Sequence, residues 1–391
     1  MCAAGQPHET GVTCAAGVCV MSCEAGWGDC NPNNYDSPGC ESNLATSSIA
    51  CGACGKDCGG GLCVGSTCSP PAETVATIPS QAPDGVITHI EVDANNVYAG
   101  EYSFLNSSTL SLAPKAPGSA PQQVTTGALL HDFAVGADAL LWLTGQVVQK
   151  RAGDGTVSTV ATLSNNEDAR FILTDSSSVW LLENAVASTP TTDASVRVLP
   201  KGATATQTVW TQKSGAWVGG LFNGTDLIVR GLGWSGSSFS SPDPNFERIS
   251  KAGAASAFGA LTTIVPFAAD SDNVYYGGDA LYAVPIGGAN AVKLWTPSAG
   301  GVFSVAVDSS NVYFAECAND SQPARLRRIP KAGGTADVIA SDSIGGYGFA
   351  GRNCEFSDNV MFGSTPLRVV ALDAGYAYWS NGQHVIRRIA K

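Results

Sequence analysis

The sequence has few basic residues, few charged residues of either sign and no long apolar run. Its 391 residues include 33 Asp and Glu but only 21 Lys and Arg, which gives a formal net charge of -12. This balance excludes a nucleic-acid binder whose affinity comes from counterion release. No stretch approaches the roughly 18 consecutive apolar residues of a membrane-spanning helix. We therefore expect no nucleic-acid partner and no transmembrane segment.

Common catalytic motifs are also missing. The chain contains no G-x-S-x-G elbow, no H-E-x-x-H pair and no P-loop, and these are the main sequence signals of serine hydrolases, zinc proteases and nucleotide-binding enzymes. Charged residues make up only 14% of the chain, whereas glycine alone accounts for 45 residues. Together with abundant Ser, Thr, Ala and Val, this composition favours short strands and turns over helices.

Cysteine is plentiful but unevenly placed, because 11 of the 13 cysteines lie between Cys2 and Cys68. This front segment has too few large apolar residues for an ordinary core, so disulfides are expected to hold it, in an oxidising compartment. Zinc is the alternative, since C-G-A-C at Cys51 has knuckle-like spacing, but crowded cysteines without nearby histidines favour bridges. The cysteines expected to pair are Cys14, Cys19, Cys23, Cys30, Cys40, Cys51, Cys54, Cys58, Cys63 and Cys68, with Cys317 and Cys354 forming a separate bridge.

The front segment holds an odd number of cysteines, and Cys2 is the one that we expect to remain unpaired there. It stands where a bacterial lipoprotein presents its acylated cysteine after removal of the signal peptide, so lipidation of Cys2 is one interpretation. A truncated repeat, or a chain start introduced at Met1, is the other.

Residues 23 to 68 contain the runs G-W-G-D-C, P-G-C-E and C-G-A-C-G-K-D-C. They resemble the cysteine-rich repeats of secreted proteins and surface lipoproteins of myxobacteria and their relatives. The resemblance implies an extracellular or outer-surface location, and it does not by itself imply an enzymatic activity. One short loop of this segment gathers oxygen-bearing side chains, which calcium accepts, although their spacing departs from an EF-hand and equally suits tight turns: Asp29, Asn31, Asn33, Asp36 and Glu41.

A proline-rich joint at residues 69–85 separates the cysteine-rich segment, residues 1–68, from a repetitive segment, residues 86–391. Each repeat begins with an apolar strand that ends in a turn, and a second strand with an aromatic residue follows. The first strands end at Asp93, Gly136, Asp175, Asn223, Asp270, Asp308 and Asp373. The second strands carry Tyr98, Trp142, Trp180, Ile228, Tyr275, Tyr313 and Tyr378.

Seven repeats of about 44 residues, each with four strands, are typical of a β-propeller. We therefore predict an all-β fold, a seven-bladed β-propeller preceded by a small, disulfide-rich and loop-rich domain. The strand pattern, such as N-V-Y-F followed by R-R-I-P-K-A-G-G, resembles secreted propellers of the YWTD and NHL type. The recurring aspartates are expected to be turn residues that bond backbone N–H groups two residues on.

The last repeat stops at Lys391 after three strands. Residues 73–79 in the joint, E-T-V-A-T-I-P, resemble the fourth strands of other repeats. We expect this segment to complete the last blade and to cover its open edge. The alternative is that a strand of another copy fills the same place, which would build a homopolymer.

Alignment of the first strands brings several polar residues to one level of the central channel: His89, Glu91, His131, Asp132, Arg170 and Arg368. His89, His131 and Asp132 could hold a metal ion there. The alternative is that these side chains are hydrogen-bonded parts of the framework.

Two further groups are candidates for binding. Trp234 lies in a long polar loop, where an indole suits stacking on a sugar or contact with a protein. A basic patch is predicted on the third strands of the last two repeats, from Arg325, Arg327, Arg328, Arg387 and Arg388, although pairing with carboxylates of adjoining strands would also explain these arginines.

The function that we predict is non-enzymatic binding or assembly outside the cell, as in adhesion, with another surface protein or a glycan as partner. One alternative is a propeller enzyme of the lyase, hydrolase or lactonase type with a metal such as calcium in its channel. The other is a subunit of an extracellular filament.

Overall fold

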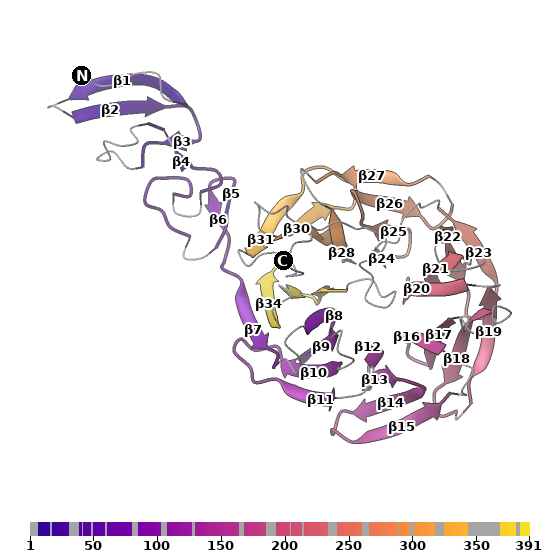
Figure 1. Ribbon diagram of the computed structural model, residues 1–391. Helices are drawn as coiled ribbons and strands as arrows, with labels where there is room; N and C mark the ends of the chain where they lie inside the picture. The colour runs from indigo at the N-terminus through magenta and orange to yellow at the C-terminus, as the bar shows by residue number, and fades with distance from the viewer. Residues whose placement is uncertain are drawn as a thin grey trace.

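The computed structural model is built from strands, and among the described residues no helix is suited to crossing a membrane (Figure 1). It describes residues 7–391 apart from positions 16–17, 31–38, 41, 48–49, 59–60, 80–84, 103–107, 127–129, 164–167, 185–192, 204, 213–214, 234–240, 260–265, 289, 298–300, 317–323, 343–367 and 381–383.

Seven four-stranded antiparallel sheets form a ring, which confirms the predicted seven-bladed β-propeller. Blade 1 consists of β8 (Val86–Val92), β9 (Asn96–Tyr102), β10 (Thr109–Pro114) and β11 (Gln122–Thr126). Blade 2 consists of β12 (Leu130–Val135), β13 (Ala139–Thr144), β14 (Val147–Ala152) and β15 (Val157–Thr162). Blade 3 consists of β16 (Asp168–Thr174), β17 (Ser178–Asn184), β18 (Ala194–Pro200) and β19 (Gln207–Gln212).

The next three blades repeat this order from the channel outward. Blade 4 consists of β20 (Gly215–Phe222), β21 (Leu227–Gly233), β22 (Ser241–Ile249) and β23 (Ala255–Phe258). Blade 5 consists of β24 (Phe267–Ala269), β25 (Asn273–Tyr276), β26 (Leu281–Pro285) and β27 (Val292–Trp295). Blade 6 consists of β28 (Val302–Val307), β29 (Asn311–Glu316), β30 (Ala324–Pro330) and β31 (Asp337–Asp342).

Blade 7 combines strands from the two ends of the propeller sequence. Its inner strands are β32 (Val370–Leu372), β33 (Tyr376–Ser380) and β34 (Val385–Ala390), and its outer strand is β7 (Glu73–Thr77) from the joint. In the antiparallel register of β34 and β7, Val385 lies opposite Thr77 and Ile386 opposite Ala76. The strand expected within residues 73–79 therefore occupies the fourth place of the last blade in the same chain.

The apolar core of the ring lies between neighbouring blades. Each of the seven interfaces has its own cluster of buried side chains. At the junction of blades 7 and 1, for example, Val75 and Ile78 pack with Ile87 and Tyr378. Because every sheet buries both faces, alternating apolar residues appear on both sides of the strands, which is why the repeat could be recognised in the sequence.

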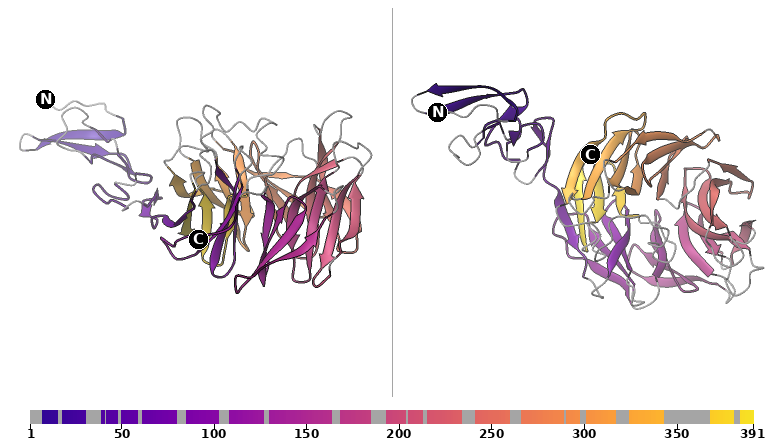
Figure 2. Two further views of the ribbon diagram at one scale, coloured as in Figure 1. Left: turned by 60° about the horizontal axis from the view of Figure 1, so that its bottom comes forward. Right: turned by 45° about the horizontal axis from the view of Figure 1, so that its top comes forward.

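The N-terminal unit lies outside the ring and reaches it through β7 (Figures 1 and 2). Its strands form three short hairpins: β1 (Glu9–Ala15) with β2 (Val18–Cys23), β3 (Trp27–Gly28) with β4 (Ser42–Asn43), and β5 (Cys63–Val64) with β6 (Thr67–Cys68).

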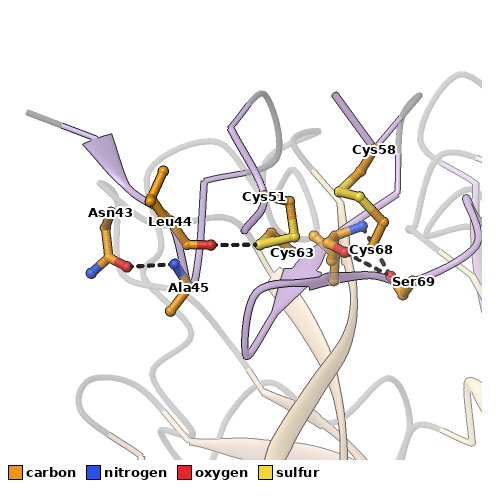
Figure 3. The surroundings of a disulfide bond; sticks show 9 residues. Asn43, Leu44, Ala45, Cys51, Cys58, Cys63, Cys68 and Ser69 are labelled. Carbon is orange, nitrogen blue, oxygen red and sulfur yellow. Dashed lines mark hydrogen bonds between the residues drawn. A yellow bond between two sulfur atoms is a disulfide. The ribbon is translucent and has the colours of Figure 1, made fainter. Parts of the chain in front are cut away.

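Four disulfides hold this unit, which confirms the predicted bridging for eight of its cysteines. They join Cys23 to Cys40, Cys30 to Cys54, Cys51 to Cys63, and Cys58 to Cys68, the last two of which are drawn in Figure 3. The two cysteines of C-G-A-C enter different bridges, so the zinc-knuckle alternative does not hold in this oxidised chain. The backbones of Cys14 and Cys19 face each other across β1 and β2. Cys2, Cys317 and Cys354 lie outside the described residues.

Candidate functional site in the central channel

Five innermost strands contain a β-bulge at the same level of the channel. The bulges fall between Ile87 and His89, Leu130 and Asp132, Ala169 and Phe171, Trp217 and Gly219, and Val302 and Ser304. A bulge inserts one residue and changes the direction of the side chains beside it. The inserted residues are Thr88, His131, Arg170, Val218 and Phe303. The bulges therefore lie at the same level of the channel as the polar residues singled out from the sequence.

His89 forms a buried bridge between blades 1 and 2. Its Nδ1 lies 2.9 Å from Oδ1 of Asp132 and its Nε2 lies 3.2 Å from Oε1 of Glu91. Burial lowers the pKa of His89, but the hydrogen bonds and negative charges of Asp132 and Glu91 outweigh it, so the pKa is raised above its usual value. Because carboxylates are acceptors, a ring that faces one at each nitrogen is best satisfied as an imidazolium that donates twice.

The two carboxylates also accept backbone N–H groups from the following blade. Oε2 of Glu91 accepts from Val135 at 2.7 Å, and Oδ2 of Asp132 accepts from Ile172 at 3.2 Å. The group therefore links blades 1, 2 and 3 through both side-chain and backbone hydrogen bonds. This is the arrangement of a framework network, which the sequence analysis left as the alternative to a metal site.

His131 contacts Arg170 of blade 3. Nη1 of Arg170 lies 3.2 Å from Nδ1 of His131. A guanidinium can only donate, so Nδ1 of the imidazole accepts and the ring proton resides on Nε2. With a cation beside one nitrogen, His131 is poorly placed to share a metal ion with Asp132.

Arg368 spans the channel. It precedes β32 of blade 7, yet its Nη2 donates to the carbonyl oxygen of Gly220 in blade 4 at 2.7 Å. Its backbone pairs with the first strand of blade 1, because its N–H donates to Thr88 and its carbonyl accepts from Ile90. Arg368 thus ties the last blade to the first and to the far side of the ring.

We searched the described residues for His, Cys, Asp and Glu side chains close enough together to share a metal ion. The group that meets this condition consists of three cysteines of the N-terminal unit. This group does not include the channel residues predicted to bind metal, His89, His131 and Asp132. Of the predicted calcium loop, only Asp29 is described, and Asn31, Asn33, Asp36 and Glu41 lie outside the described residues, as does Trp234.

The predicted basic patch consists largely of paired arginines. Arg327 donates to Glu316 at 2.6 Å, and Arg325 lies 4.0 Å from the same carboxylate. Arg328 lies 3.6 Å from Asp337, and Arg388 lies 2.7 Å from Glu73. Pairing with adjoining strands, the alternative in the sequence analysis, accounts for these four contacts.

At the opposite end of the inner strands, the recurring aspartates build the turns as predicted. In each of these aspartates, Oδ1 accepts a hydrogen bond of 2.7–2.9 Å from the backbone N–H two residues later. The five are Asp93, Asp175, Asp270, Asp308 and Asp373. Oδ2 accepts from the aromatic side chain five residues on where that residue can donate, for example from Tyr98 at 2.6 Å and Tyr378 at 2.8 Å.

Sequence reasoning missed the lysines that join five of the blade turns to the next blade. The pairs, which we call latches, are Lys115 with Asp373, Lys251 with Asp175, Lys331 with Asp270, Lys391 with Asp308 and Lys201 with Asp138. Burial alone would raise the pKa of Asp308 and Asp373, but the lysine and the backbone hydrogen bonds lower it to about 2. The signal was present in the sequence as the lysine that follows the third strand, as in P-K-A-G-G, one blade after the aspartate.

A pocket of about 650 Å³ opens beside two latches, between blades 5 and 6. Its lining includes Asp270, Asp272, Asp308 and Lys331. Two of the lining carboxylates, Asp270 and Asp308, already accept lysine ammonium groups.

Comparison with known proteins supports the fold and gives no family. No family model matches the chain, and no curated protein matches it. Solved structures that are similar include virginiamycin B lyase from Staphylococcus aureus, with a TM-score of 0.56 and 10% identity over 81% of this chain and 98% of that one. YCF48 bound to D1 peptide has a TM-score of 0.55 and 10% identity over 82% and 96%. At this identity, the likeness defines a propeller protein without assigning its activity.

Proposed function

We propose that this chain is a non-enzymatic binding protein of the cell exterior, in which a rigid propeller presents recognition loops. The observation that carries the proposal is that the charged side chains of the channel are engaged in hydrogen bonds within the protein. Three charged side chains of the channel are candidates for acid–base chemistry: His89, Glu91 and Asp132. Their hydrogen bonds link neighbouring blades, so they serve the framework of the ring. A general acid or base must instead be within reach of a substrate proton.

The connections between strands support recognition at one face of the ring. First and second strands are joined by tight turns, such as the one between Val92 and Asn96, whereas β17 ends at Asn184 and β18 begins at Ala194. The long connections between second and third strands, and those between blades, open on the same face of a propeller. Loops on a rigid scaffold commonly carry binding residues.

An exterior location is supported by the four disulfides of the N-terminal unit, because such bridges persist in oxidising compartments. The ligand class that we propose is a glycan or another surface protein. Trp234 lies in the connection between β21 and β22, and an indole there would stack on a sugar ring or fill a protein pocket.

The test is a binding measurement with the full chain against a glycan array and against crosslinked cell-surface extracts, followed by affinity measurement on the ligand found. Trp234→Ala is expected to weaken binding roughly tenfold or more, as hot-spot aromatics do. Val157→Thr is the matched control, because Val157 is 49% exposed on an outer strand; it should bind like the wild type. Turnover of a polysaccharide or lactone that stops on removal of a bound metal would overturn the proposal in favour of the enzyme.

A further inference from the structure

Arg368 is a half-buried cation of the channel without a counter-charge. Among the described residues, its side chain makes one hydrogen bond, 2.7 Å long, from Nη2 to the carbonyl oxygen of Gly220. No carboxylate in the described part of the chain lies within ion-pair distance of it. A guanidinium has five N–H donors and remains protonated in proteins, so a single carbonyl leaves its charge unneutralised.

Arginines on the third strands of the blades are treated differently. Arg248 pairs with Asp226 and Arg327 pairs with Glu316, each at 2.6 Å. Where these arginines belong to the framework, the chain therefore supplies a carboxylate for each. A half-buried charge that has lost part of its hydration is unfavourable without such a partner. Arg368 is thus suited to an anion that comes from outside the chain.

Arg170 places a second cation on the same side of the channel. It is the inserted residue of the bulge in β16, and its Nη1 lies 3.2 Å from Nδ1 of His131 on β12. The guanidinium of Arg368 reaches Gly220 on β20. Because β16 lies between β12 and β20 in the ring, the two guanidinium groups flank the innermost strand of blade 3 (Figure 1).

The described side chains at the level of the bulges carry one more positive than negative charge. The cations are Arg170, Arg368 and His89, whose ring faces a carboxylate at each nitrogen, and the anions are Glu91 and Asp132. One negative charge from a ligand would balance the level. A divalent anion such as sulfate would exceed that balance, and a metal cation would be repelled.

We propose that the channel binds one carboxylate group of a small organic ligand, with Arg368 as the main anchor and Arg170 as the second cation. A planar guanidinium binds a carboxylate through two parallel N–H···O bonds, which an inorganic monoanion such as chloride cannot form. This site goes beyond the surface recognition proposed above, because it lies in the channel and does not involve Trp234.

The experiment uses the full, oxidised chain and isothermal titration calorimetry. The probes are glucuronate and benzoate, with glucose and benzamide as their uncharged counterparts. At least one acid should bind with one site per chain and a Kd of about 1 mM or lower, and neither uncharged compound should bind. Binding of glucuronate alone would identify a sugar acid as the ligand, and binding of benzoate alone would identify an apolar acid. Failure of both acids to bind would overturn the proposal.

Arg368→Gln should weaken binding of the acid about tenfold or more, because it removes a charge-assisted hydrogen bond. Arg368→Lys should recover only part of the affinity, since an ammonium cannot bind a carboxylate through two parallel bonds. Arg151→Gln is the matched control. Arg151 is also half-buried, and it lies on β14, the third strand of blade 2, so the variant removes the same charge away from the channel.

Arg151→Gln should bind the acid like the wild type. Equal weakening by Arg151→Gln and Arg368→Gln would mean that overall charge attracts the acid, and the proposal would fail. Thermal melting shows whether each variant is folded. If Arg368→Gln does not fold, Arg170→Gln decides, because it also removes a cation from this level, and unchanged binding would overturn the proposal. Trp234→Ala should leave binding in the channel unchanged, so this site and the surface function are tested separately.

Discussion

At the scale of single residues, the latches show how one side chain can make neighbouring blades interdependent. Each lysine reaches an aspartate in the turn of the preceding blade, and Lys115 of blade 1 closes the series on Asp373 of blade 7. The interface of blades 4 and 5 has neither the aspartate nor the lysine of a latch. The turn residue there is Asn223, and Ile286 stands where latched blades have lysine. A buried ammonium without a carboxylate would be costly, so the two replacements belong together.

This pairing predicts the outcome of restoring the latch. Ile286 is 8% exposed and packs in the interface cluster, so Ile286→Lys alone should lower the free energy of unfolding by about 1–3 kcal/mol. Adding Asn223→Asp should recover part of that loss, with a coupling free energy of about 0.5–1 kcal/mol. Chemical denaturation of the two single variants and the double variant measures it; strictly additive effects would show that no ion pair forms.

His89 makes stability depend on pH. Its folded pKa is raised, so its contribution is fully present below the ordinary histidine pKa of about 6.5 and is lost as pH rises through the folded value. His89→Gln cannot ionise and should be less stable than the wild type by about 3 kcal/mol at low pH. This difference should shrink on going to alkaline pH.

The measurement is the free energy of unfolding against pH for both chains. His8→Gln is the control, since the His8 side chain is 36% exposed and lies in the N-terminal unit; its curve should follow the wild type. A constant difference between His89→Gln and the wild type across the series would mean that His89 acts only by packing.

At the scale of elements, β7 decides whether the ring closes within one chain. It pairs with β34, its residue Val75 is fully buried, and Thr74 and Val75 accept backbone N–H groups from Gly118 and Ser119 of blade 1. Without it, β34 would present a row of unpaired backbone groups, which invites pairing between copies.

Two truncations separate the roles of β7 and of the cysteine-rich unit. A chain lacking residues 1–72 keeps β7 and should elute as a monomer with near-native melting. A chain lacking residues 1–79 loses β7 and should melt several degrees lower, as expected for a loss of a few kcal/mol, and associate through β34. Size-exclusion chromatography and thermal melting check both. Equal behaviour of the two truncated chains would contradict closure by β7.

Most elements could be predicted from the sequence, because blades repeat and each buries both faces. Blade 2 carries its second-strand aromatic residue one position later than the other blades with such a residue do. In the register of blade 2, Leu141 pairs with Ala134 at the place of the tyrosines, and Trp142 pairs with Phe133 one residue later. The Trp142 side chain packs with Tyr98 and Phe133 between blades 1 and 2. Aromatic residues are favoured on either face of a strand, so the sequence alone could not resolve a difference of one residue in the position of Trp142 along its strand.

For the molecule as a whole, the number of blades, the aspartate turns and the bridging of the front cysteines could be predicted from the order of residues alone. These follow from local patterns repeated at a fixed period and from a segment too poor in apolar residues to fold otherwise. The contacts of His89, His131 and Arg368 depend on the folded ring, since each of these side chains reaches across blades to groups 39 to 148 residues away. Spacing along the chain carries no information on which nitrogen meets which oxygen, because that depends on how the seven sheets are placed around the channel.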